Sequence, residues 1–194
     1  MISAPMCLVK SGDNEKIAMD LPSLLFRERM VFLFHEITDD LACSVIQQLL
    51  ALEALDDRKP IQIYINSPGG SVSAGLAIYD TMCRLKCEVE TICVGSACSM
   101  AAVLLAAGTK GKRYATENST VMIHQVLGGA SGQATDVEIA CRNIIQTKER
   151  LNRLLAKMTG RDVEQVRLDC ERDNFMTASQ ALGYGLIDQV LEND

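Results

Sequence analysis

Three residue types that together can cleave an acyl bond occur along this 194-residue chain in the order serine, histidine, aspartate. Ser99 follows a run of small residues, His124 is one of only two histidines, and Asp173 lies in a Glu-Arg-Asp sequence. A serine becomes a nucleophile when a histidine accepts its proton and a carboxylate orients that histidine. Chymotrypsin-like, subtilisin-like and α/β-hydrolase triads run in other orders, so the order here narrows the candidate folds.

Each member of this set also has an ordinary structural interpretation. A serine at a helix start is more often an N-cap than a nucleophile, and an aspartate near a helix end is usually solvated. Ala97 and Ala101 stand where a Gly-x-Ser-x-Gly elbow would have glycine. The three residues alone therefore do not establish a hydrolase.

The neighbouring elements decide whether the three residues can meet. Ser99 comes after an expected strand at 89–94 and opens an apolar helix that runs to about residue 107. Free N–H groups at a helix start can stabilise an oxyanion, and Met100 would supply one of them. A second could come from Gly69-Gly70 after an expected strand at 61–66, because glycine lets the backbone approach a substrate closely. His124 is expected near the end of a strand at 119–125.

The remaining pattern is one of alternating strands and helices. Strand–helix–strand order predicts parallel strands with right-handed crossovers, and so an α/β fold. Residues 1–25 look irregular. The other expected elements are a strand at 30–34, a helix at 39–56 capped by Thr38, helices at 73–85, 133–158 and 162–170, and a final strand at 186–191.

Size and composition favour one cytoplasmic domain over residues 26–194. A net charge of −6 argues against a nucleic-acid surface or a polybasic membrane surface, and no apolar run is long enough to span a membrane. No secretory signal opens the chain. Eight cysteines without a Cys-x-x-Cys pair predict reduced thiols, and two histidines argue against a metal site.

Six segments in order carry a resemblance that covers the chain from about Arg27 to the C-terminus. Together they resemble the ClpP family, the proteolytic subunits of the ATP-dependent Clp protease (peptidase family S14). The segments are 64–70, 78–82, 95–100, 121–125, 128–136 and 171–176.

The resemblance implies roles for the residues already singled out. It implies Ser99 as nucleophile, His124 as general base and Asp173 as the orienting carboxylate. It implies the amides of Gly70 and Met100 as the oxyanion hole. The implied fold is crotonase-like, with repeated β-β-α units and a protruding handle at about 127–158.

The family also implies an assembly and partners. Its subunits form two stacked seven-membered rings around a chamber. An AAA+ Clp unfoldase such as ClpX, ClpA or ClpC uses ATP to feed unfolded polypeptides into it. The proteolytic subunit itself would need no cofactor and no metal. Glu171, Arg172 and Gln133 match positions at the contact between rings.

Some residues depart from the family pattern. Val126 replaces a usual proline, and residues 1–25 lack the family's usual axial-pore sequence. In the unfoldase docking pocket Tyr64, Ile92 and Tyr114 fit the family, but Arg84 stands where an aromatic residue is usual, and a buried unpaired charge would disfavour an inserted aliphatic loop. These departures suggest a divergent isoform that docks its unfoldase weakly or works beside a second ClpP paralogue.

Two other functions stay open from the sequence. A crotonase-like acyl-CoA hydratase or isomerase would share the fold and the oxyanion hole, but it uses carboxylates and needs no Ser-His pair. A poorly active scaffold subunit of a mixed complex would be expected to lack a triad member, whereas all three are present.

Overall fold

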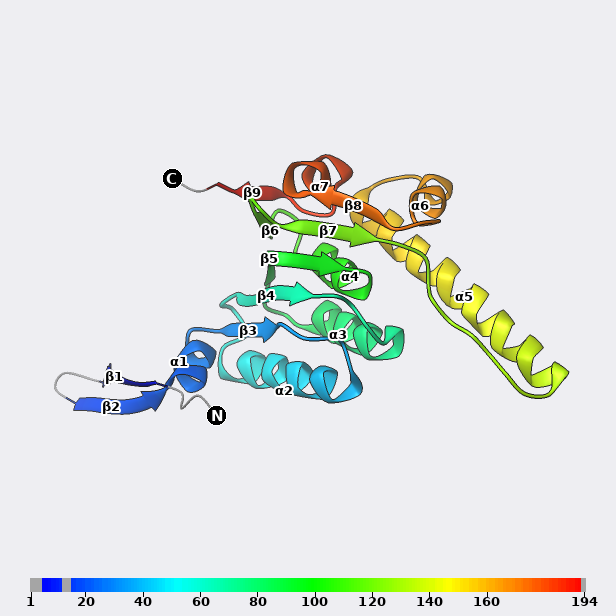
Figure 1. The fold of residues 1–194 in the computed structure, drawn as a ribbon. Coiled ribbons are helices and arrows are strands. Elements are labelled where there is room, and N and C mark those ends of the chain that lie inside the picture. Colours follow the sequence, from blue (N-terminus) through cyan, green and yellow to red (C-terminus); the bar gives the residue numbers. More distant parts are fainter. Residues whose placement is uncertain (1–4, 12–14, 193–194) are drawn as a thin grey trace.

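A seven-stranded, largely parallel sheet forms the centre of the protein (Figure 1). The computed structural model describes residues 5–11 and 15–192. The parallel path runs in the order β3, β4, β5, β6, β9, and β5 also pairs with β7, which pairs antiparallel with β8. The strands are β3 (Met30–Leu33), β4 (Ile61–Ser67), β5 (Val89–Cys98), β6 (Arg113–Thr116), β7 (Thr120–Ile123), β8 (Asn174–Thr177) and β9 (Gln189–Leu191). The α/β class expected from the sequence is confirmed.

Strand β5 is long enough to pair with two strands on the same side. Its residues 91–93 pair with β6, and its residues 96–98 pair with β7. The second pairing carries the end of β5 to the end of β7. Ser99 and His124, which directly follow these strands, therefore start from the same edge of the sheet.

Helices α2 (Asp39–Leu55), α3 (Val72–Arg84) and α4 (Met100–Ala106) pack with the buried face of the sheet. Alternate β4 residues, Ile61, Ile63 and Ile65, point into this core and are at most 1% exposed. Every residue of α4 is buried, so the helix that follows Ser99 is fixed on all sides. Thr38 caps α2 by accepting a hydrogen bond from the Leu41 N–H, as the sequence predicts.

Helix α5 (Ala134–Thr159) extends well beyond the sheet (Figure 1). Asn152 and Leu155 in its C-terminal half are its buried residues, and Gly160 ends it with φ +75°. Helix α6 (Val163–Asp169) follows. Helix α7 (Ala178–Tyr184), which the sequence analysis does not anticipate, begins with a capping box between Thr177 and Gln180.

The N-terminal region is more regular than the sequence suggests. Strands β1 (Met6–Ser11) and β2 (Glu15–Asp20) pair antiparallel, and α1 (Leu21–Arg27) begins at the cap Asp20. The expectation of an irregular segment over residues 1–25 is therefore wrong for the described part, because local pairing between β1 and β2 organises it. Residues 1–4 and 12–14 lie outside the described residues.

A buried ion pair ties the C-terminal segment to the core. Arg113 is 1% exposed and makes two hydrogen bonds to the Asp188 carboxylate, at 2.6 and 2.7 Å. The same guanidinium donates to the carbonyls of Ala106 and Met158, near the ends of α4 and α5. One side chain thus joins α4, α5 and the loop before β9.

Within the described residues, no helix is both long and apolar enough to cross a membrane.

Candidate active site

Ser99 occupies a strained turn between β5 and α4. Its φ of +56° and ψ of −122° lie where side-chain-bearing residues are rarely found. The Ser99 N–H donates to the Met122 carbonyl at 2.8 Å, and the carbonyl of Ser99 accepts from α4. Ser99 is the N-cap residue of α4, but its side chain makes no capping hydrogen bond. The ordinary structural role of such a serine is therefore not the one used here.

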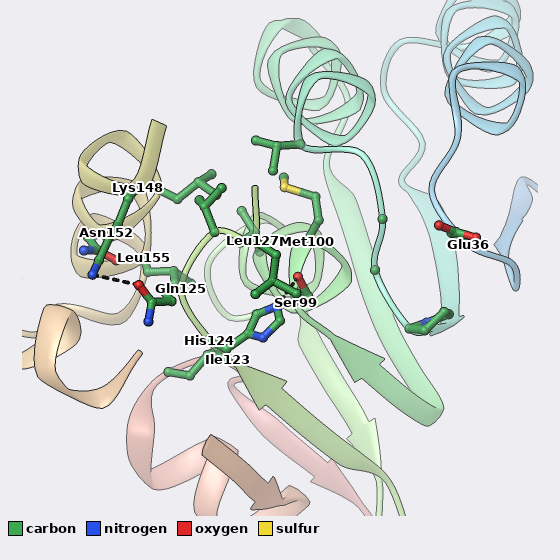
Figure 2. A pocket seen from close by; sticks show the side chains of 17 residues that line it. Glu36, Ser99, Met100, Ile123, His124, Gln125, Leu127, Lys148, Asn152 and Leu155 are labelled. Atoms are coloured by element: carbon green, nitrogen blue, oxygen red, sulfur yellow. Dashed lines mark hydrogen bonds between the residues drawn. The ribbon is translucent and has the colours of Figure 1, made fainter. Parts of the chain in front are cut away.

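The Ser99 hydroxyl faces His124 instead (Figure 2). His124 Nε2 lies 2.8 Å from Ser99 Oγ, and His124 Nδ1 lies 3.0 Å from Asp173 Oδ1. Ser99, His124 and Asp173 thus form one continuous chain of hydrogen bonds. Proton transfer from the hydroxyl to an imidazole held by a carboxylate is the chemistry that this geometry permits.

The two ends of this chain differ in exposure. The His124 side chain is 14% exposed, whereas the Asp173 side chain is 60% exposed. Asp173 directly precedes β8, and His124 directly follows β7. The last pair of that ladder is Ile123 and Asn174, so both residues lie one step beyond it.

The turn after β4 brings glycine backbone against Ser99. A Cβ on Gly69 would lie 2.7 Å from Ser99 Cβ and 2.7 Å from the Cys98 carbonyl oxygen. Gly69 and Gly70 both have positive φ, at +94° and +146°. Ile37 holds this turn in place, because its N–H donates to the Gly69 carbonyl and its own carbonyl accepts from Ser71.

Two backbone N–H groups near Ser99 are the candidates for stabilising an oxyanion. In the described part of the chain, none of the hydrogen bonds that fix these turns uses the N–H of Gly70 or that of Met100. Met100 opens α4, where a helix leaves its first N–H groups unpaired. Donors at such places stabilise charge that develops during a reaction.

A cavity of about 420 Å³ adjoins Ser99, and Figure 2 shows the residues around it. The sequence does not predict most of these residues, because they come from separate elements, α3, α4, α5 and the segment after β7. One polar member, Asn152, is 6% exposed. The apolar members that line it are Pro68, Val72, Met100, Val103, Ile123, Val126, Leu127, Leu151 and Leu155.

The family model described as Clp protease matches residues 13–194. The chain belongs to the Clp protease family. That membership covers the turn with Ser99, the strand end with His124 and the segment with Asp173, so the geometry above is that of a ClpP-type chain.

In this ClpP-type chain the residues expected to dock an unfoldase divide between two places. Tyr64, Ile92 and Tyr114 lie opposite one another on β4, β5 and β6, and Phe32 on β3 continues the row. Tyr64 stacks on Phe32 with ring centroids 5.6 Å apart. Arg84, at the last residue of α3, belongs to the helix layer, which covers the opposite face of the sheet. Within one chain the structure does not bring Arg84 to the row.

The residues expected between rings are also split. Glu171 and Arg172 lie beside Asp173 and are exposed. Gln133 is the N-cap of α5, and 1.5 Å per residue places it about 22 Å along the helix from Lys148, which contacts Glu171. Gln133 is thus separated from the other two in the chain.

Among residues 5–11 and 15–192, no group of three or more His, Cys, Asp or Glu side chains could hold a metal ion. All eight cysteines are free. Burial, together with the nearby Asp173 carboxylate, raises the pKa of the Cys98 thiol, which disfavours its reactive thiolate.

Proposed function

We propose that the chain is a serine endopeptidase subunit that hydrolyses peptide bonds of unfolded proteins. The observation that carries the proposal is the unbroken hydrogen-bond chain Ser99–His124–Asp173 beside a cavity and two unpaired N–H groups. His124 would take the Ser99 proton as Oγ attacks the peptide carbonyl. Asp173 would hold the resulting imidazolium in the correct orientation.

The reaction then follows from the same groups. The N–H groups of Gly70 and Met100 would stabilise the tetrahedral oxyanion, and His124 would return its proton to the leaving amine. Water, activated by His124, would hydrolyse the acyl-enzyme and free Ser99. The largely apolar cavity beside Ser99 supports binding of an apolar substrate side chain next to the scissile bond.

We further propose that the chain works in two stacked seven-membered rings fed by an AAA+ Clp unfoldase such as ClpX, ClpA or ClpC. Unfolding would consume ATP in that partner, and this chain would use no cofactor of its own. The 60% exposure of Asp173 supports a role for assembly, because a triad carboxylate normally works in shielded surroundings. Free cysteines are consistent with a cytoplasmic role in protein quality control.

The departures in the docking region favour a divergent isoform. Gln62 donates to Glu90 in the row next to Tyr64, so this part of the surface is more polar than an aliphatic loop prefers, whereas Arg84 lies in the helix layer of its own chain. We therefore retain the proposal that homomeric rings dock an unfoldase weakly, or that a second ClpP paralogue shares the rings. Strong stimulation of degradation by an unfoldase acting on homomeric rings would refute it.

The alternative of an acyl-CoA hydratase or isomerase has less support. Such an enzyme would need carboxylates at the reacting carbon. Here a serine hydroxyl, already hydrogen-bonded to a histidine, lies beside the unpaired N–H groups. A scaffold role is disfavoured by the same complete triad.

The Ser99→Ala substitution tests the peptidase proposal. We expect hydrolysis of a short fluorogenic peptide to fall by at least about 10³-fold, because the nucleophile is removed while the oxyanion donors remain. A fluorophosphonate probe should label Ser99 in the natural chain and nothing in the variant. The control is Ser44→Ala, an exposed serine on α2, which should leave both readings unchanged. Peptide hydrolysis that persists in Ser99→Ala would sink the assignment.

A further inference from the structure

Lys148 connects three parts of the chain around the His124–Asp173 pair. Its ammonium donates to Gln125 Oε1 at 3.0 Å and to Glu171 Oε2 at 3.1 Å. Gln125 completes the triangle, since its amide donates to the Glu171 carbonyl at 2.9 Å. Figure 2 shows Lys148 reaching from α5 toward Gln125.

This triangle of contacts lies just beyond the end of the β7–β8 ladder. The β7–β8 ladder ends at Ile123 and Asn174, so its pairing stops one residue before His124 and Asp173. Gln125 is the residue after His124, and Glu171 is two residues before Asp173. The contacts among Lys148, Gln125 and Glu171 therefore continue the connection between the two segments beyond the last ladder pair.

Lys148 is also well placed to be fixed itself. Its side chain is 26% exposed, while that of its partner Glu171 is 54% exposed. On α5 it stands one turn before Asn152, which is the first buried residue of that helix. Its stem leaves the helix at the point where α5 begins to pack on the body of the protein.

We propose that Lys148 is a positioning residue that holds His124 and Asp173 in register through Gln125 and Glu171. It acts through these two residues and takes no part in bond breaking. Misplacing a catalytic group by about 1 Å can cost about 10²-fold in rate, so a clamp at this place has a measurable effect. The inference rests on the proposed peptidase function.

The test compares Lys148→Met with Lys148→Arg and with Lys157→Met. Lys157 is an exposed lysine on the same helix, outside the site. The readings are kcat for a fluorogenic peptide and the rate at which a small alkyl fluorophosphonate labels Ser99. The small probe reports Ser–His activation without filling the cavity that Lys148 also lines. Light scattering checks that each variant assembles like the natural chain.

We expect kcat and labelling to fall together by about tenfold in Lys148→Met, since both need the same register. Lys148→Arg should recover most of the loss, because a guanidinium can also donate to both partners. Lys157→Met should match the natural chain. Gln125→Ala should lose activity to a similar extent, and the double variant with Lys148→Met should be no worse than either alone. If Lys148→Met fails to assemble, kcat and labelling of Gln125→Ala test the positioning role instead.

Two results would overturn the proposal in different ways. Labelling of Lys148→Met at the natural rate, in a chain that is itself active, would refute the positioning role alone. A natural chain that assembles but is neither labelled nor active would refute the peptidase function, and the role of Lys148 with it.

Discussion

The two halves of the candidate site are built in different ways. The half that holds the proposed nucleophile, here called the nucleophile half, consists of Ser99, the buried helix α4 and the glycine turn after β4, which are held by backbone hydrogen bonds and close packing. The base half consists of His124 and Asp173, which lie past the end of a short ladder. One half is closed by the chain's own core, whereas the carboxylate of the other is 60% exposed.

This difference indicates that one chain fixes the nucleophile half by its own packing, whereas the position of the base half depends on what surrounds it. The turn at Ser99 cannot move without disturbing α4, in which every residue is buried. The carboxylate of Asp173 can move at little cost unless Lys148, its partners or a neighbouring subunit restrain it. We therefore expect damage to the nucleophile half to abolish activity under all conditions, and damage to the base half to depend on assembly.

Among substitutions outside the triad, Gly69→Ala should have the largest effect on peptide hydrolysis. A Cβ at Gly69 would come within 2.7 Å of both Ser99 Cβ and the Cys98 carbonyl oxygen, so the oxyanion turn must shift. Loss of one oxyanion donor costs about 10² to 10³-fold in kcat, and a displaced turn should reach at least that. Peptide hydrolysis and the melting temperature would be measured together.

Gly111→Ala is the matched control for this change. Gly111 also has a positive φ, +86°, but a Cβ there would meet nothing within 4 Å. It therefore shares the backbone strain without the clash at the nucleophile. If both variants lose activity equally, backbone strain explains the loss, and close packing around Ser99 is not what makes the nucleophile half sensitive.

Asp173→Asn tests the base half. An asparagine amide can donate to His124 Nδ1 and so favour the wrong tautomer, which in a shielded triad costs about 10⁴-fold in kcat. With the carboxylate 60% exposed we expect about 10²-fold for the isolated chain, and a larger loss wherever assembly shields this position. Fluorophosphonate labelling of the isolated chain and of the assembled particle, after the two are separated by size, would measure both losses. The exposed Asp40→Asn on α2 serves as control, and equal losses in the two assembly states would argue against a role for the subunit contact.

The sequence predicts the parts of this site that depend on local pattern. The strand before Ser99, the cap at Thr38 and the break after β4 all follow from short-range residue types, and the structure has them. Helix α7 could have been predicted too, because Thr177 and Gln180 have the spacing of a capping box. The pairing of β1 with β2 is a weaker pattern, since the consecutive residues Met6, Cys7, Leu8 and Val9 are all apolar and give β1 no alternation between an apolar and a polar face.

Other features depend on contacts between distant residues and could not be predicted. Arg113 is buried only because Asp188, 75 residues later, returns to meet it. Lys148 reaches Gln125 and Glu171 across 23 residues in each direction. The positive φ of Ser99 is a property of the turn between two fixed elements, and the sequence around it reads as an ordinary helix start.

Asp188→Asn should lower stability without altering the triad. Burial alone would raise the pKa of the Asp188 carboxyl, but hydrogen bonds and charge from Arg113 lower it to about 2 from 3.8. A group with a lowered pKa in the folded state stabilises above its unfolded pKa, so this contribution, about 2 kcal/mol, is complete above about pH 5 and is lost progressively between about pH 5 and 1. Removing the charge should cost about 3 kcal/mol, because Arg113 would be left buried and unpaired.

Urea unfolding at pH 7 and pH 3 would measure this loss. The natural chain should lose stability on acidification, and the difference between it and Asp188→Asn should narrow at pH 3. Asp57→Asn, which breaks the exposed pair with Lys86, should change stability by less than about 0.5 kcal/mol. A difference that stays constant between the two pH values would show that the Asp188 charge does not anchor this region.

Cys98→Ser should have the smallest effect, and it tests whether solvent reaches the strand before Ser99. Cys98 precedes the nucleophile, and burial with the Asp173 carboxylate raises the pKa of its thiol. A protonated thiol is a poor nucleophile, so iodoacetamide at neutral pH should modify exposed Cys43 well before Cys98. We expect kcat/KM within about twofold of the natural chain, and equal resistance of Cys98→Ser and Cys43→Ser to iodoacetamide. Rapid inactivation that only Cys98→Ser prevents would mean that solvent reaches the strand before Ser99. The close packing of the nucleophile half would then begin only at Ser99.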